Sequence, residues 1–175
     1  MAIGPDIGWE EEGLAAIGNR RAPSQIIYSI LEQFPARNFF PEAQRHGVGL
    51  LTRVPHASGL LDGTVKPGMS FDSTDHRSFR KQEWLENSLR KVARLAFLHG
   101  KESGRTIGQA AIQFALAAPM VASVLPNITN LEQLREFSAA PETAALRQEE
   151  LDSIFDLYDH DFYLSVETAP SAGAG

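Results

Sequence analysis

The sequence contains no cysteine among its 175 residues. This absence excludes a disulfide framework and a thiolate metal site, and no metal ligands are predicted. No apolar run is long enough to cross a bilayer, so no membrane span is expected. The net charge of −6 at pH 7 disfavours a nucleic-acid partner, because phosphate backbones require a basic surface. The N-terminus has no basic stretch followed by an apolar one, so no signal peptide is expected and a cytoplasmic location is predicted.

What the sequence does contain is the composition of a folded domain. Hydrophobic residues make up 43% of the chain and charged residues 22%, values typical of a globular protein with a core. We expect one domain over 1–165, followed by a flexible tail over 166–175, where the residues are mostly small and polar.

Three short apolar runs, at 25–30, 48–51 and 121–125, are each followed by helix-like sequence. They predict buried strands over 25–28, 48–52 and 121–125. Strands that alternate with helices favour an α/β fold with a parallel sheet and right-handed crossovers. No G-x-G-x-x-G motif follows any of the three runs, which disfavours a Rossmann domain. The alternative is a segment of a (β/α)8 barrel.

Local signals predict where several helices begin and end. A first helix is expected over 9–19, with Glu10, Glu11 and Glu12 matching the dipole of its first turn. Pro41 fits the first position of a short helix, and Gly47 fits its end.

Further helices are predicted in the second half of the chain. Thr106 and Gln109 form a capping box. Asn130 is a candidate cap for the next helix, with Gln133 reaching back. Other helical positions are marked by apolar residues at helical spacing. These are Leu85, Leu89, Val92 and Ala96; Leu131, Leu134 and Phe137, expected to face inward; and Leu151, Ile154, Phe155 and Tyr158.

The connection over 54–80 is long and polar, which is typical of a functional or disordered loop. Within it, residues 75–77 (Asp-His-Arg) are a candidate catalytic or switch motif, because a carboxylate can tune a neighbouring histidine. A solvated loop with a local salt bridge is the favoured interpretation. Residues 159–161 (Asp-His-Asp) are a poor metal site, because adjacent positions on a helix do not face one way.

Three segments resemble the aldo/keto reductase family. The stretch GVGLLTRVPHASGLLDG over 47–63 is similar to the segment after the seventh barrel strand of the family. The stretch over 106–137 is similar to its helix, eighth strand and cofactor-binding helix. The stretch QIIY over 25–28, with Leu31, is similar to its sixth strand. The likeness covers roughly 3–163 and concerns the C-terminal half of the family only. It implies a partial TIM barrel, made of the last three strands with their flanking helices.

The resemblance also implies a nicotinamide cofactor, NADP or NAD, and residues that would hold it. Gln25 matches a contact to the nicotinamide amide, and Arg53 stands where relatives often place an aromatic ring. Ser58 and Gly59 match the loop around the pyrophosphate. The residues matching the adenosine end are Asn127, Asn130 and Gln133.

Some of these residues also have simpler interpretations, and two features depart from the family pattern. Asn130 and Gln133 can act only as helix caps, the Ser58–Gly59 pair as a turn, and Arg53 as an ion-pair partner. Phe137 replaces an asparagine that is common in relatives. The sequence has no Lys or Arg at 129–130, which weakens the case for NADP.

The catalytic Asp, Tyr, Lys and His of the family are not matched in this sequence, and neither Tyr28 nor Tyr158 has the context of the catalytic tyrosine. One hypothesis is therefore the C-terminal portion of an NAD(P)H-dependent reductase, inactive until a complementary N-terminal half supplies the proton donor. The alternatives are a non-catalytic half-barrel that acts in self-association or complementation, and a stand-alone dinucleotide-binding module.

Overall fold

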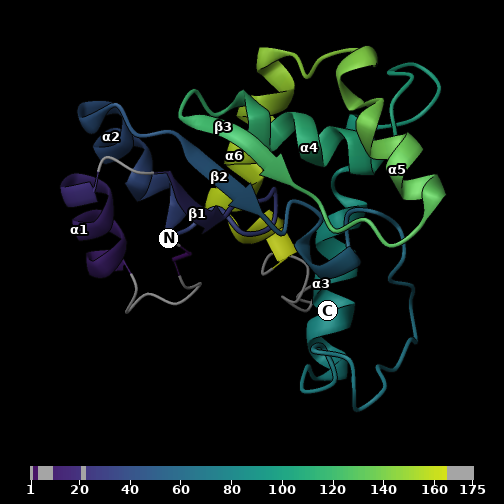
Figure 1. The fold of residues 1–175 in the computed structure, drawn as a ribbon. Coiled ribbons are helices and arrows are strands. Elements are labelled where there is room, and N and C mark those ends of the chain that lie inside the picture. The colour runs from purple at the N-terminus through teal and green to yellow at the C-terminus, as the bar shows by residue number, and fades with distance from the viewer. Residues whose placement is uncertain (1, 4–9, 21–22, 165–175) are drawn as a thin grey trace, which may run out of the picture.

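The computed structural model describes residues 2–3, 10–20 and 23–164. Its centre is a parallel sheet of strands β1 (Ser24–Ile27), β2 (Leu50–Arg53) and β3 (Val121–Leu125), in the order β1-β2-β3 (Figure 1). The predicted α/β architecture with a parallel sheet is confirmed. Strand β2 begins two residues later than predicted.

The two faces of the sheet differ in burial. Along β1 and β2, buried and half-buried residues alternate, as expected when successive side chains point to opposite faces. Ser24, Ile26, Leu50 and Thr52 occupy the buried face. The alternate positions, which include Arg53, are half-buried. One face of the sheet therefore carries the core, and the other is only partly covered.

The helices supply the cover of the buried face. In Figure 1, α4 and α6 lie behind the sheet, and α1 packs beside α2 at one edge. A Cβ atom on Gly13 would lie 2.6 Å from the ring of Phe39, so the glycine allows α1 to approach α2 closely. Trp9, predicted in the first helix, and the predicted tail over 166–175 lie outside the described residues. The helices are α1 (Glu10–Arg20), α2 (Ala36–His46), α3 (Gln82–Ala93), α4 (Ile107–Ala117), α5 (Leu131–Ser138) and α6 (Gln148–Asp159).

The start of α2 differs from the prediction. The helix begins at Ala36, so Pro41 lies inside it rather than at its first position. An interior proline cannot donate a backbone hydrogen bond to the carbonyl four residues earlier. Buried contacts of Ala36, Phe39 and Ala43 hold the helix in place despite this loss. The predicted end is confirmed, because Gly47 follows the helix in the left-handed conformation, with φ of 64°.

The inward face of α5 also differs from the prediction. Phe137 is buried as expected, but Leu131 and Leu134 are 58% and 46% exposed. Gln133 and Phe137, one turn apart, are the residues that α5 buries. The helix of eight residues packs against the rest of the protein through a narrow face that contains Gln133 and Phe137, and the two leucines lie outside this face.

Several other predictions are confirmed. The capping box of Thr106 and Gln109 is present at the start of α4, and Leu85 is buried in α3. Ile154 is buried in α6, whereas Ala96 falls in a short 3-10 turn after α3. Residues 54–80 contain turns and one 3-10 turn, Ala57–Gly59, as expected of a long loop. No helix within the described ranges is long and apolar enough to cross a membrane.

Candidate functional site

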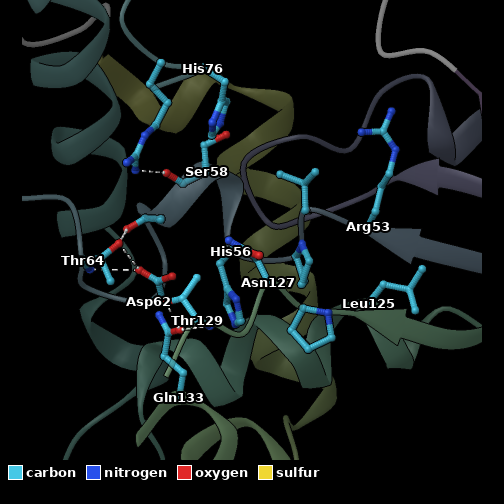
Figure 2. Close-up of a pocket in the computed structure, with 15 residues that line it drawn as sticks. Arg53, His56, Ser58, Asp62, Thr64, His76, Leu125, Asn127, Thr129 and Gln133 are labelled. Atoms are coloured by element: carbon cyan, nitrogen blue, oxygen red, sulfur yellow. Dashed lines mark hydrogen bonds between the residues drawn. The ribbon is translucent and has the colours of Figure 1, made fainter. Parts of the chain in front are cut away.

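A cavity of about 560 Å³ lies at the carboxyl ends of β2 and β3. The two strands end side by side, because Arg53 pairs in register with Leu125. The loops that follow them, over 54–64 and 126–133, form most of the wall (Figure 2). We call this the strand-end cavity. In open parallel sheets, ligands bind at this edge, outside the carboxyl ends of the strands.

The loop after β2 has an unusual backbone. Val54, Ala57 and Ser58 have φ values of 59°, 47° and 58°. A positive φ is uncommon for any residue with a side chain and strained for a β-branched one. Gly59 follows with φ of 91°, and a Cβ atom there would lie 2.6 Å from Oγ1 of Thr64. The loop therefore makes a tight, backbone-lined turn that requires glycine at this position.

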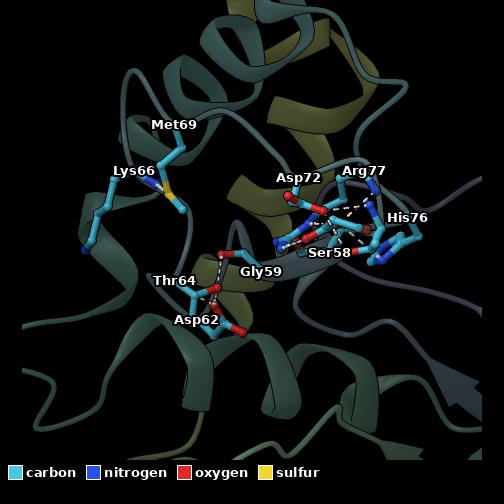
Figure 3. Close-up of polar contacts among 11 residues, drawn as sticks. Ser58, Gly59, Asp62, Thr64, Lys66, Met69, Asp72, His76 and Arg77 are labelled. Carbon is cyan, nitrogen blue, oxygen red and sulfur yellow. Dashed lines mark hydrogen bonds and ion pairs between the residues drawn. The ribbon is translucent and has the colours of Figure 1, made fainter.

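Arg77 holds this turn from across the loop. Its Nη1 donates to the carbonyl of Ser58 at 2.9 Å, and its Nη2 pairs with Asp75 at 2.6 Å (Figure 3). Hydrogen bonds from the Arg77 side chain and backbone hold the pKa of Asp75 well below its ordinary value. The predicted local salt bridge is confirmed. Arg77 and the exposed His76 also line the cavity, a placement that was not predicted.

Asp62 and Thr64 stabilise the far end of the same loop. One carboxylate oxygen of Asp62 accepts hydrogen bonds from the N–H and the hydroxyl of Thr64, at 2.9 and 2.7 Å (Figure 3). The Thr64 hydroxyl also lies 3.3 Å from the carbonyl of Gly59. These contacts form an Asx turn, which fixes the position of an acidic side chain on the cavity wall.

His56 is a buried ring beneath the cavity. Its Nε2 lies 3.2 Å from the carbonyl of Gly108, and its ring lies 4.2 Å from that of Phe137, centroid to centroid. Burial lowers the pKa of His56, so the ring is neutral at pH 7 and we assign its proton to Nε2. Nδ1 has no hydrogen-bond partner within the described residues. Phe137 therefore packs against His56.

The first turn of α5 closes another side of the cavity. Asn130 caps the helix as predicted, because its Oδ1 accepts from the backbone N–H of Gln133 at 2.8 Å. The side chain of Gln133 reaches back to Thr129 rather than to Asn130, and accepts from its N–H and hydroxyl, both at 2.9 Å. The N-terminus of a helix is a favourable position for a phosphate.

Five of the seven residues predicted for the cofactor lie together on the wall of the strand-end cavity. They are Arg53, Ser58, Gly59, Asn127 and Gln133. The other two do not line it.

These two residues have other positions. Asn130 serves as the cap of α5. Gln25 lies in the middle of β1, where its carbonyl accepts the N–H of Ile3 at 2.8 Å. Arg53 donates to the carbonyl of Ile3 at 3.4 Å and has no salt bridge to a described residue.

The cavity residues that were not predicted lack a local sequence signal. His56 has no charged or polar neighbour in the sequence that marks it, and its partners Gly108 and Phe137 lie far along the chain. Asp62 and Thr64 resemble ordinary loop residues in the sequence, and His76 and Arg77 were expected only to take part in a local salt bridge. Only their convergence in space identifies them.

The arrangement suits an elongated ligand with an anionic centre. Figure 2 shows Arg53 toward one end of the cavity and Asp62, Thr129 and Gln133 toward the other. The turn at Gly59, which has no room for a side chain, and the first turn of α5, which includes Gln133, both face this cavity and together can accept a pyrophosphate. The residues present therefore fit a dinucleotide. No group of three His, Asp or Glu side chains in the described ranges could hold a metal ion.

Comparisons with known proteins agree with this geometry. The family model described as "Aldo/keto reductase family" matches residues 20–159. A probable voltage-gated potassium channel subunit beta from Arabidopsis thaliana is 31% identical over 113 residues, which cover 62% of this chain and 34% of that protein. The L-glyceraldehyde 3-phosphate reductase of Escherichia coli O157:H7 is 32% identical over 140 residues, or 74% of this chain and 39% of that enzyme.

A solved structure shows the same fold. The glycerol dehydrogenase of Gluconobacter oxydans superposes with a TM-score of 0.64 at 19% identity, over 80% of this chain and 43% of that one. The chain thus spans less than half the length of each of these proteins.

Proposed function

Because the chain belongs to the aldo/keto reductase family, we propose that it supplies the cofactor-binding portion of an NAD(P)H-dependent carbonyl reductase. Members of this family are oxidoreductases that use a nicotinamide dinucleotide. The observation that carries the proposal is the strand-end cavity, where the Gly59 turn and the start of α5 face one space. The relatives are more than twice as long as the matched segment, so the activity of a whole protein is part of the proposal.

Different residues of the cavity would contact different parts of the cofactor. The turn at Ser58 and Gly59 and the first turn of α5 would hold the pyrophosphate. Asn127 and Gln133 would contact the adenosine end. Arg53 would lie against the nicotinamide, since a planar guanidinium can stack on a ring. When bound, the cofactor supplies the hydride that reduces a carbonyl.

A carbonyl reduction also needs a proton donor within hydrogen-bond reach of the substrate oxygen. Neither candidate tyrosine lines the strand-end cavity. Tyr28 is buried among the helices, and the hydroxyl of Tyr158 accepts the backbone N–H of Phe34 at 3.1 Å. We therefore propose that the donor comes from residues outside this sequence, and that the 175 residues alone do not turn over an aldehyde.

We further propose that β1, β2 and β3 correspond to the last three strands of an eight-stranded barrel. The half-buried face of the sheet would then line the barrel interior, and a complementary half would complete it. This would explain why Arg53 and Leu125 are less buried than residues on the opposite face. Gln25 lies on the same half-buried face as Arg53, which supports its proposed role near the nicotinamide.

The test is a fluorescence titration of the full chain with NADH and with NADPH. We expect saturation, and we expect the Gly59→Ala variant to bind about tenfold more weakly, or roughly 1.4 kcal/mol, because its Cβ atom displaces Thr64. Gly63→Ala is the matched control, because Gly63 also has a positive φ, of 73°, but its nearest outside atom is 4.0 Å away. The lack of saturation at millimolar cofactor, or equal weakening by both variants, would contradict the proposal.

One observation favours a second function, that of a non-catalytic half-barrel that associates through its sheet. Leu125, at the end of edge strand β3, is 41% exposed, and Ile27 and Leu51 on the same face are half-buried. Covering a few hundred Å² of such surface at about 25 cal/mol per Å² gives several kcal/mol before the cost of association. Sedimentation velocity distinguishes the two functions, since a monomer at micromolar concentration that binds cofactor favours the first.

A further inference from the structure

A second cavity, of about 320 Å³, lies between α2, α4 and α6. We call it the helix-layer cavity. It shares no lining residue with the strand-end cavity, and the three helices that border it are visible in Figure 1. The proposed cofactor chemistry does not use it.

Four of its ten lining residues are aromatic. The ring of Tyr28 stacks on that of Phe114, with centroids 5.0 Å apart and an angle of 28°. Phe40 meets Tyr28 edge-on at 5.1 Å, and Phe155 lies 5.8 Å from Phe114. Ala117, at the end of α4, also lines the cavity and leaves space. Such a wall offers faces and edges to a further aromatic ring.

The one hydroxyl on this wall has no partner. Tyr28 is 1% exposed, and its hydroxyl makes no hydrogen bond to any of the described residues. Burial, opposed in part by the charge of Arg37, raises the pKa of Tyr28 above its ordinary value, so the hydroxyl carries its proton at neutral pH. The hydroxyl oxygen is not among the fully buried polar atoms that lack a partner, so it reaches the cavity, where a ligand oxygen would accept its hydrogen bond.

The charges around the cavity are already paired. Arg37 of α2 binds Asp159 of α6 through two contacts, of 2.5 and 3.4 Å, and its guanidinium lies 5.4 Å from the ring centroid of Phe155. Gln148, the other polar residue on the wall, is neutral. A charged ligand would have to compete with Asp159 or remain unpaired, so the surroundings favour a neutral one.

We propose that the helix-layer cavity binds a neutral single-ring aromatic molecule of the phenol class, whose oxygen accepts a hydrogen bond from the Tyr28 hydroxyl. A dry apolar cavity of about 150 Å³ is already large enough for benzene, so 320 Å³ accommodates a substituted ring. The ring packs against Phe114 and Phe155.

The experiment is a calorimetric titration of the full chain with phenol, toluene and benzoate. We expect phenol to bind more tightly than toluene or benzoate. The Tyr28→Phe variant should bind phenol about three- to tenfold more weakly, the range for one neutral hydrogen bond, with toluene unchanged. Ala117→Leu should weaken both, because its larger side chain fills the cavity. Leu116→Ala is the control, since Leu116 is an exposed neighbour on α4 that does not line the cavity.

Thermal unfolding provides the check that each variant folds. Removing an unpaired hydroxyl costs nothing in the native state, so Tyr28→Phe should melt at or above the temperature of the parent chain. A lower melting temperature, equal phenol binding by the parent chain and Tyr28→Phe, tighter binding of benzoate, or no binding of phenol would each overturn the proposal. These outcomes are independent of the NADH and NADPH titrations, which concern the strand-end cavity, because the two cavities share no lining residue.

Discussion

Replacing Glu150 by glutamine should destabilise the protein strongly, because it leaves a buried guanidinium without a counter-charge. Glu150 and Arg105 form an ion pair whose side chains are only 6% and 2% exposed. The other bonds of the guanidinium go to neutral carbonyls, including those of Leu98 at 2.7 Å and Ala144 at 2.8 Å. Glu150 is thus the only carboxylate bonded to Arg105 among the described residues.

The magnitude follows from the burial of the pair. Removing one partner of a buried ion pair costs about 3–5 kcal/mol. Glutamine keeps one oxygen that can accept from Arg105, so we expect a loss of about 2–4 kcal/mol in the free energy of unfolding. Urea denaturation followed by far-UV circular dichroism measures it. Arg147→Ala is the control, because Arg147 also contacts Glu150, at 3.4 Å, but is 73% exposed, and exposed pairs contribute about 0–1 kcal/mol.

The pH dependence offers a second readout. Burial acts to raise the pKa of Glu150, but the backbone N–H of Arg147 and the charge of Arg105 hold it below the ordinary value. The stabilisation is therefore complete above the pKa of the unfolded chain, about 4.3, and is lost as pH falls through the lower folded pKa. The difference between the parent chain and Glu150→Gln should shrink in the same range. A loss no larger than that of Arg147→Ala at pH 7 would refute the reasoning.

Three further predictions concern packing and pH. Gly13→Ala should lower the free energy of unfolding by about 1–3 kcal/mol, because the new Cβ atom would lie 2.6 Å from Phe39; urea denaturation that shows no loss would mean that α1 shifts freely. Because the folded pKa of His56 is lowered, its contribution to stability is present above the unfolded pKa of about 6.5 and falls with pH below it; His56→Leu should remove that slope between pH 7.5 and 5.5. Phe137→Ala should lower the free energy of unfolding by about 3–5 kcal/mol, because Phe137 is buried. Leu131→Lys should change it by less than about 0.5 kcal/mol, because Leu131 is exposed. Equal losses in thermal melts would mean that Leu131 faces inward after all.

The features that could be predicted from the sequence act over a few residues. The capping box of Thr106 and Gln109 and the helix end at Gly47 depend only on a turn of backbone, so local sequence suffices. The position of Pro41 inside α2 could not be predicted in this way, because contacts with other elements outweigh its local preference. The same reason explains Leu134, whose exposure depends on how α5 meets α4.

The residues of the candidate site likewise fall into those that the sequence could predict and those that depend on distant contacts. Ser58 and Gly59 lie in the loop after a strand, and the resemblance to a family predicts them near a cofactor. The structure places both on the cavity wall. His56 could not be singled out, because its burial depends on Phe137 in a distant helix. Arg77 was expected only to pair locally, and its contact with Ser58 depends on the path of the loop between them.

The bond from Arg77 to Ser58 spans 19 positions of the chain. This contact joins the two ends of the loop between Ser58 and Arg77, so the positions of both ends are fixed regardless of the length of the chain between them. Doubling the length of such a closed loop costs only about 0.6 kcal/mol in entropy. Insertions into its exposed part, over 66–70, would therefore leave the glycine turn in place, and a peptide tag could be placed there.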